Sequence, residues 1–154
     1  MTPYADTNFY TRIYLQLPES AAADRLLREA KQGGAAPLPL TWLHRVEILN
    51  AFQLHVFQSH EAGQSYVSSR QTALALGNFR DDTQKSEFLR AVKIPDEELE
   101  RQFEELSLRR TARHGCRTYD LLHVASALLL GCDTFWSFDA KANHLARLEG
   151  LKLR

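Results

Sequence analysis

The clearest fold signal in this chain is the stretch Thr134-Phe135-Trp136-Ser137-Phe138-Asp139. Residues 134–138 are mostly apolar, which is typical of a strand in a parallel sheet that is covered on both faces. An acid ends this strand, and a helix is predicted after it, near 141–149. Because ligands of such sheets bind outside the carboxyl ends of the strands, Asp139 is a candidate site residue.

Short strands alternate with helices over the rest of the chain, which predicts an α/β sandwich with a parallel sheet. Thr41 and Thr118 are predicted to cap the helices that follow them. Residues 78–85 are polar and are interpreted as a loop, followed by a short helix around Phe88 and Leu89. The predicted strands are 3–6, 38–41, 92–94, 134–138 and 151–153, and the predicted helices lie near 7–17, 20–32, 42–59, 64–77, 96–114, 119–130 and 141–149.

The composition, with 44% hydrophobic and 25% charged residues, is typical of one globular domain spanning residues 1–154. No apolar run approaches the ~20 residues that span a bilayer. The first residues have neither the basic nor the apolar region of an export signal, so we expect a cytoplasmic protein with no membrane partner. Two cysteines, Cys116 and Cys132, are too few for a disulfide framework or a zinc site.

Four acids occupy positions where acids are uncommon. Asp6 ends a short strand, Glu47 lies inside an apolar helix, Asp120 begins a second apolar helix, and Asp139 ends the strand 134–138. Carboxylates that converge on one point repel each other by roughly 4 kcal/mol per pair at about 4 Å and an effective dielectric of about 20. We therefore expect a cation to neutralise the group, and oxygen ligands favour Mg²⁺ or Mn²⁺.

Each acid also has a purely structural interpretation. Asp6 and Asp139 are good helix N-caps, and Asp120 in a first turn complements the helix dipole. Glu47 lies between two aliphatic residues, although its side chain could reach water at the helix edge. Taken together, the positions favour one shared site over several coincidences.

The net charge of zero, from 19 basic and 19 acidic residues, shows no basic footprint of nucleic-acid binding. If a metal neutralises the four acids, 15 acidic residues remain against the 19 basic residues, a net charge of +4. Arginine outnumbers lysine, which suits bidentate phosphate contacts. The charge balance therefore leaves a nucleic-acid partner open.

A further signal comes from four segments, which are Asp6-Thr7-Asn8, Val46-Glu47-Ile48-Leu49-Asn50-Ala51, Tyr119-Asp120-Leu121-Leu122-His123-Val124-Ala125-Ser126-Ala127, and Cys132-Asp133-Thr134-Phe135-Trp136-Ser137-Phe138-Asp139 with Leu145-Ala146. In this order and spacing, they resemble the PIN-domain ribonucleases, and most closely the VapC-type toxins of bacterial toxin–antitoxin pairs. The resemblance covers essentially the whole chain. The polar first strand and the long polar stretch 78–95 depart from the family pattern.

The resemblance implies a three-layer α/β/α sandwich with a central parallel sheet of about five strands. It assigns the catalytic and metal-binding roles to Asp6, Glu47, Asp120 and Asp139, with Mg²⁺ or Mn²⁺ as the cofactor. The implied activity is hydrolysis of RNA to products with a 5′-phosphate and a 3′-hydroxyl. The implied partners are the RNA substrate, a cognate antitoxin protein and a second copy of the chain in a homodimer. The alternative is a non-catalytic PIN-like module that binds RNA or protein.

Two further groups of residues could support this site. Candidates for orienting the acids are Thr7, Asn8, Thr118 and His123. Candidates for contacting RNA phosphates are Arg12, Arg113, Arg117 and Lys141. Both groups also have structural interpretations, namely polar helix starts, a core histidine, and arginines that complement a helix dipole.

Overall fold

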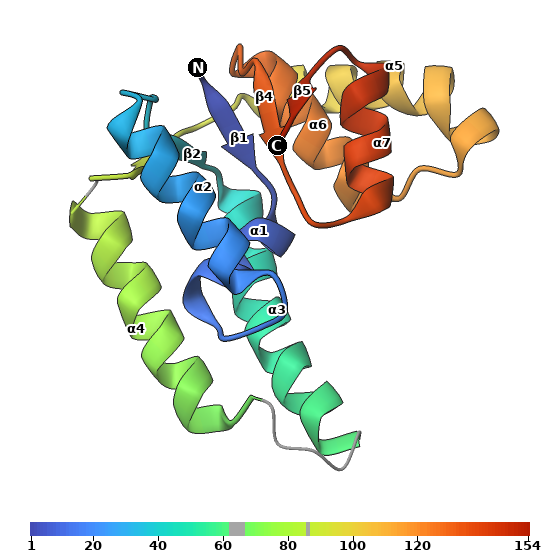
Figure 1. Ribbon diagram of the computed structural model, residues 1–154. Coiled ribbons are helices and arrows are strands. Elements are labelled where there is room, and N and C mark those ends of the chain that lie inside the picture. Colours follow the sequence, from blue (N-terminus) through green and yellow to red (C-terminus); the bar gives the residue numbers. More distant parts are fainter. Residues whose placement is uncertain (62–66, 86) are drawn as a thin grey trace.

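The computed structural model describes residues 1–61, 67–85 and 87–154, which form seven helices and five short strands (Figure 1). Among these residues, no helix combines the length and the apolar character needed to cross a membrane. The strands are β1 (Pro3–Ala5), β2 (Leu38–Leu40), β3 (Leu89–Ala91), β4 (Thr134–Trp136) and β5 (Lys152–Leu153). The helices are α1 (Thr7–Tyr14), α2 (Ser20–Gln32), α3 (Trp42–Glu61), α4 (Ser69–Lys85), α5 (Asp96–His114), α6 (Thr118–Leu129) and α7 (Ala140–Leu148).

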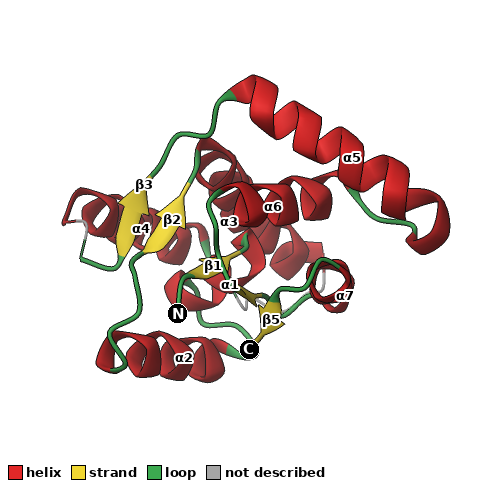
Figure 2. Cartoon of the chain, turned by 90° about the horizontal axis from the view of Figure 1, so that it is seen from above, coloured by secondary structure: helices red, strands yellow, loops and turns green. Residues whose placement is uncertain are grey.

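The strands form two parallel sheets. β4 lies between β1 and β5 in one sheet, and β2 pairs with β3 in the other. The predicted α/β fold with parallel strands is therefore confirmed, but the strands are divided between two sheets although β2 contacts β1 (Figure 2). Leu38 donates its N–H toward β3, so the next residue, Pro39, faces the other way and has no N–H to donate toward β1.

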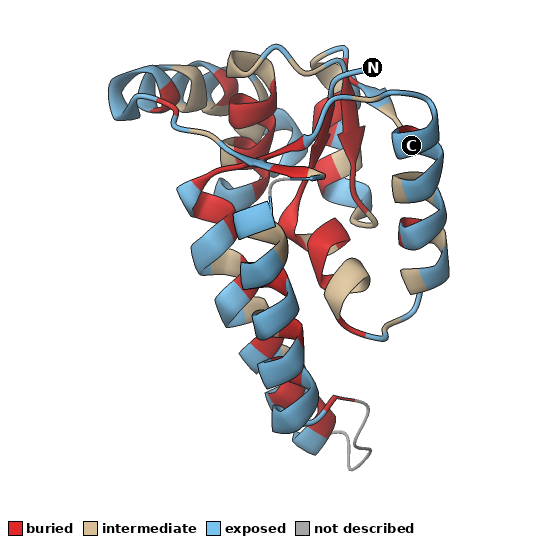
Figure 3. Ribbon diagram, turned by 90° about the vertical axis from the view of Figure 1, so that its left-hand side faces the viewer, coloured by how far each residue is buried: buried red, intermediate tan, exposed pale blue. Residues whose placement is uncertain are grey.

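Side chains of β1 and β4 alternate between two hydrophobic cores. Tyr4 and Phe135 are cross-strand partners whose rings stack with centroids 5.8 Å apart, and they pack with residues of α5, α6 and α7. Ala5 and Trp136, the next pair along, pack with residues of α1 to α4. Because successive strand residues point to opposite faces, this sheet is the middle layer between two helical layers, and the residues of β1 and β4 are buried (Figure 3).

The sequence-based assignment is wrong between the third helix and the third strand. The sequence predicts a helix near 64–77 and a loop at 78–85, but α4 extends over Ser69–Lys85. Thr72, Ala75 and Phe79 form its buried stripe, and most of its polar residues face water. Residues 64–66 of the predicted helix lie outside the described residues.

The third strand also lies elsewhere than predicted. The sequence predicts a short helix around Phe88 and Leu89 and a strand at 92–94, whereas β3 occupies Leu89–Ala91. Leu89 is fully buried and lies opposite Leu38 in the register with β2. Pairing with a distant strand therefore determines the conformation of a segment whose own sequence is a poor strand former.

The remaining helices lie close to their predicted limits. Gly115, for example, ends α5 in the left-handed conformation with φ of 62°, a conformation that favours glycine at helix ends. One predicted cap is wrong, because Thr118 is the first residue of α6 and Arg117 occupies the N-cap position. This shift matters, because it places Arg117 beside the acid that follows in the first turn of α6.

Candidate active site

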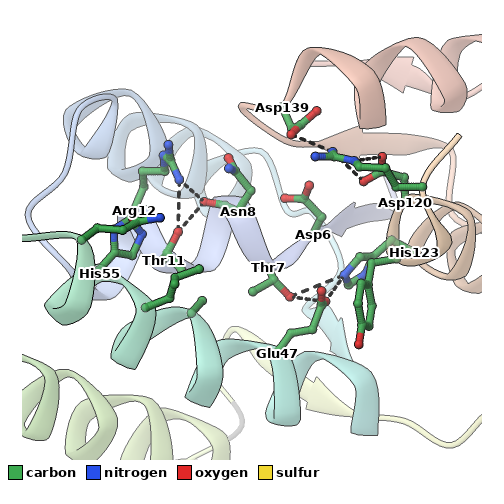
Figure 4. A pocket seen from close by; sticks show the side chains of 15 residues that line it. Asp6, Thr7, Asn8, Thr11, Arg12, Glu47, His55, Asp120, His123 and Asp139 are labelled. Carbon is green, nitrogen blue, oxygen red and sulfur yellow. Dashed lines mark hydrogen bonds and ion pairs between the residues drawn. The ribbon is translucent and has the colours of Figure 1, made fainter. Parts of the chain in front are cut away.

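A pocket of about 450 Å³ opens at the carboxyl ends of β1 and β4 and is lined by residues of α1, α3 and α6. All four acids selected from the sequence, Asp6, Glu47, Asp120 and Asp139, line this pocket (Figure 4). They are brought there by four different elements that are far apart in the chain. This position matches the rule that parallel sheets bind ligands beyond the carboxyl ends of their strands.

Asp6 is a buried carboxylate held at both oxygens. It follows β1 and caps α1, accepting the Phe9 N–H at Oδ1 over 2.9 Å, while Ser137 donates its hydroxyl to Oδ2 over 2.6 Å. Burial raises the pKa of Asp6 to about 6, and His123, Ser137 and Phe9 act in the opposite direction. The capping role is therefore real, and the same side chain also faces the pocket.

Asp139 caps α7 in the same way that Asp6 caps α1. Its Oδ1 accepts the N–H groups of Lys141 and Ala142, at 2.7 and 3.2 Å. Ser137 joins the two acids, because its hydroxyl donates to Asp6 and accepts the Asp139 N–H at 2.9 Å. Burial raises the pKa of Asp139, but hydrogen bonds from Arg117 and the backbone outweigh that effect and leave the pKa below its ordinary value.

Asp120 shares a guanidinium with Asp139. Arg117 donates from Nε and Nη2 to the two oxygens of Asp120, at 2.7 and 3.0 Å, and Nη2 also donates to Asp139 Oδ2 at 2.8 Å. The expectation that a cation alone offsets the clustered acids is therefore corrected, because a protein side chain supplies a positive charge between two of them.

Glu47 is hydrogen-bonded to two neighbours on other helices. Its Oε2 accepts the Thr7 hydroxyl at 2.8 Å and the Nε2–H of His123. The other ring nitrogen of His123 contacts the Tyr4 hydroxyl at 2.9 Å. Burial raises the pKa of Glu47, but the contacts with His123 and Thr7 outweigh it, so the pKa is lowered overall and the side chain is ionised at neutral pH.

The start of α3 is fixed to β1 by His44, a residue that the sequence reasoning missed. The Thr41 N–H donates to its Nδ1 over 3.0 Å, and its Nε2–H donates to the carbonyl of Ala5 over 2.8 Å. Burial lowers the pKa of His44 well below its ordinary value, which keeps the ring neutral. Because Glu47 lies three residues further along α3, this contact sets its position relative to Asp6.

Residues 4–148 match the PIN domain. The chain belongs to the PIN-domain family. PIN domains have a three-layer α/β/α fold, are generally nucleases and typically bind divalent metals. A search of curated proteins finds no match.

In this PIN domain, three of the four predicted supporting residues line the pocket, namely Thr7, Asn8 and His123. Asn8 accepts the Phe138 N–H at 3.2 Å, which links α1 to the end of β4. Thr118 is exposed and is not part of the described pocket wall. Ser137 was missed by the sequence reasoning, although its place two residues before Asp139 could have indicated it.

Of the predicted phosphate contacts, Arg12 and Arg117 line the pocket of this PIN domain. Arg12 lies with His55 at the opposite end from Asp120 and His123 (Figure 4). Its guanidinium is held by Glu19, by the carbonyl of Asn8 and by the Thr11 hydroxyl. The other two candidates, Arg113 and Lys141, are both described by the structure and lie outside this pocket wall.

The donor set of the pocket suits a hard divalent cation, because four carboxylates supply oxygen ligands. Yet among the residues that the structure describes, no three His, Cys, Asp or Glu side chains are grouped closely enough to hold one ion. The guanidinium of Arg117 lies between Asp120 and Asp139. The residues therefore fit a cation by their chemistry, and binding one ion with three of them requires these side chains to move closer together.

Proposed function

We propose that this PIN domain is a Mg²⁺- or Mn²⁺-dependent endoribonuclease that acts as the toxin of a toxin–antitoxin pair. The observation that supports nuclease activity is the meeting of Asp6, Glu47, Asp120 and Asp139 in one pocket that also contains two arginines. The similarity of four sequence segments to VapC-type toxins supports the toxin role.

The proposed reaction is hydrolysis of an RNA phosphodiester. Water adds to phosphorus while the bond from phosphorus to O3′ breaks, and a proton passes to O3′, which leaves a 5′-phosphate and a 3′-hydroxyl. When bound, a divalent cation supplies a Lewis acid that activates water and offsets the charge of the phosphate. Asp6, Glu47, Asp120 and Asp139 are the residues that would hold it.

The protein's own contribution is to position charge before the substrate arrives. Asp6 is fixed by hydrogen bonds at both oxygens, and Glu47 is kept ionised by His123 and Thr7. Arg12 on the pocket wall offers hydrogen-bond donors to the phosphate oxygens of a bound strand. A fixed donor such as Arg12 stabilises negative charge that develops on the phosphate without reorganising during the reaction.

The proposed partners are the RNA substrate, a cognate antitoxin and a second copy in a homodimer, in the cytoplasm where RNA is found. Helix α3 supports protein binding, because Trp42, Val46 and Leu49 are about half exposed. These positions are spaced by four and three residues and so share one side of the helix. Exposed apolar side chains grouped in this way are typical of binding surfaces.

The test is cleavage of RNA by the purified protein with Mg²⁺ or Mn²⁺, compared between wild type, Asp6→Asn and Asp120→Asn. Asp24→Asn on the exposed side of α2 is the matched control. We expect cleavage by the wild type and the control, and loss of at least a hundredfold in both pocket variants, with folding checked by thermal unfolding. Full activity in both pocket variants would exclude the proposed role of these acids.

The second candidate function is a non-catalytic module that binds RNA or protein. It is favoured by the contacts of Arg117, which offset charge on Asp120 and Asp139 with no bound ion required. The same experiment separates the two functions. Binding of RNA by the wild type without cleavage in Mn²⁺ would support the binding module.

A further inference from the structure

One basic residue lies inside the acidic part of the pocket. Arg117 donates to both oxygens of Asp120 and to Oδ2 of Asp139, over distances of 2.7 to 3.0 Å. The remaining oxygen of the pair, Asp139 Oδ1, accepts two backbone N–H groups of α7. All four oxygens of these two carboxylates are therefore already engaged by donors from the protein.

The position of Arg117 is set by the fold and leaves half of its side chain exposed to water. The residue precedes α6 with an extended backbone, φ −84° and ψ 149°, so its side chain lies along the first turn beside Asp120. The Arg117 side chain is 50% exposed, whereas the carboxylates of Asp120 and Asp139 are 12% and 28% exposed. The guanidinium can therefore move into water, while the two carboxylates remain in place.

The Arg117 guanidinium and a divalent cation compete for the same carboxylate oxygens of Asp120 and Asp139. A cation such as Mg²⁺ needs its oxygen ligands at about 2.0–2.1 Å in a near-octahedral arrangement. The carboxylate oxygens would then lie close to both positive groups, and two cations at such short range repel each other strongly. Moving Arg117 away from at least one carboxylate removes that repulsion.

We propose that Arg117 is an internal counter-ion that competes with the divalent cation for Asp120 and Asp139 and so sets the metal affinity of the site. The inference rests on the proposed function in one respect, because it takes these two carboxylates as cation ligands. In this arrangement the arginine limits loading to conditions in which free cation is abundant. Once displaced, its guanidinium lies at the mouth of the pocket.

The test is titration of the purified protein with Mn²⁺ alone, by calorimetry and by thermal shift, with no RNA present. The variants are Arg117→Met, which removes the charge, and Arg117→Lys, which keeps the charge but cannot form the planar bridge. Arg101→Met, on the exposed side of α5, is the matched control. We expect roughly tenfold tighter Mn²⁺ binding by Arg117→Met, a smaller gain for Arg117→Lys, and no change in the control.

Thermal shift adds a second readout. Without Mn²⁺, Arg117→Met should melt at a lower temperature than the wild type, because Asp120 and Asp139 lose their counter-ion, and saturating Mn²⁺ should raise its melting temperature by more. Mn²⁺ binding by Arg117→Met that is no tighter than that of the wild type, including no binding by either, would overturn the inference. If Arg117→Met does not fold, the same comparison between Arg117→Lys and the wild type decides.

These outcomes are separate from those of the RNA cleavage assay. Tighter Mn²⁺ binding by Arg117→Met in a protein that cleaves no RNA would preserve the inference and reject the nuclease. Cleavage of RNA by a wild type whose Mn²⁺ affinity is unaffected by Arg117→Met would preserve the nuclease and reject the counter-ion.

Discussion

His123 on α6 donates a hydrogen bond from Nε2 to Oε2 of Glu47 on α3, a residue 76 positions earlier in the chain. Through its other ring nitrogen, His123 also contacts the buried hydroxyl of Tyr4 on β1. One imidazole therefore connects the central sheet with both helices that bring acids to the pocket.

We predict that His123→Leu lowers the free energy of unfolding at pH 7 by about 2 kcal/mol, because the buried Tyr4 hydroxyl loses its contact with the ring and the Glu47 carboxylate keeps only the hydrogen bond from Thr7. The pKa of Glu47 should rise above its ordinary value, since burial then acts with less opposition. Chemical denaturation and NMR titration of the Glu47 carboxyl carbon measure the two effects. His144→Leu, at an exposed histidine, is the control and should change stability by less than about 0.5 kcal/mol. Equal stability losses in the two variants would contradict the role given to His123.

The pKa of Asp6 predicts a pH-dependent difference in stability. Burial raises it to about 6 from an ordinary value of 3.8, so the folded protein holds this proton more tightly than the unfolded chain. The Asp6 contribution to stability is therefore present below about pH 4 and is lost as the pH rises through about 6. Asp6→Asn keeps a good N-cap and removes this titration. The free energy of unfolding of Asp6→Asn minus that of the wild type should therefore increase by about 2 kcal/mol between pH 4 and pH 7. Urea denaturation across that range is the measurement, and a constant difference would show that the Asp6 carboxyl is not strongly perturbed.

We predict that Arg12 makes a salt-dependent contribution to RNA binding. Its side chain lies on the pocket wall, is only 17% exposed and is held by three oxygen acceptors, so it offers a fixed positive charge. Arg12→Gln should weaken binding of single-stranded RNA and reduce the slope of log K against log salt by about 0.7. Binding is measured in EDTA so that no cleavage occurs. Arg28→Gln, on the exposed side of α2, should leave the slope unchanged. An unchanged slope for Arg12→Gln would place the RNA elsewhere.

The convergence of the acids could be predicted from the sequence because it depends on a general property of parallel sheets. Asp6 and Asp139 each follow a strand, and the carboxyl ends of parallel strands meet at one edge. The contacts among their side chains could not be predicted in this way. The bridge from Arg117 to Asp120 and Asp139 depends on α6 lying beside the start of α7, which is a property of tertiary packing.

The positions of α4 and β3 were wrongly predicted from the sequence for two different reasons. The start of α4 had a local signal, because Ser68 and Gln71 form a reciprocal capping box in which each side chain accepts the other residue's N–H. That spacing was present in the sequence and was missed. β3 had no comparable signal, since Leu89-Arg90-Ala91 becomes a strand only by pairing with β2. Short strands of this kind are determined by their partners.

The pairing of β1 with β4 also determines when the pocket can exist during protein synthesis. Asp6 is synthesised long before the strand that fixes its position, which begins at Thr134, and Ser137 and Asp139 come later still. The nascent polypeptide therefore carries an incomplete set of acids until Asp139 has left the ribosome. If the folded protein cuts RNA, the messenger that encodes it is spared by the nascent chain until Asp139 has been added.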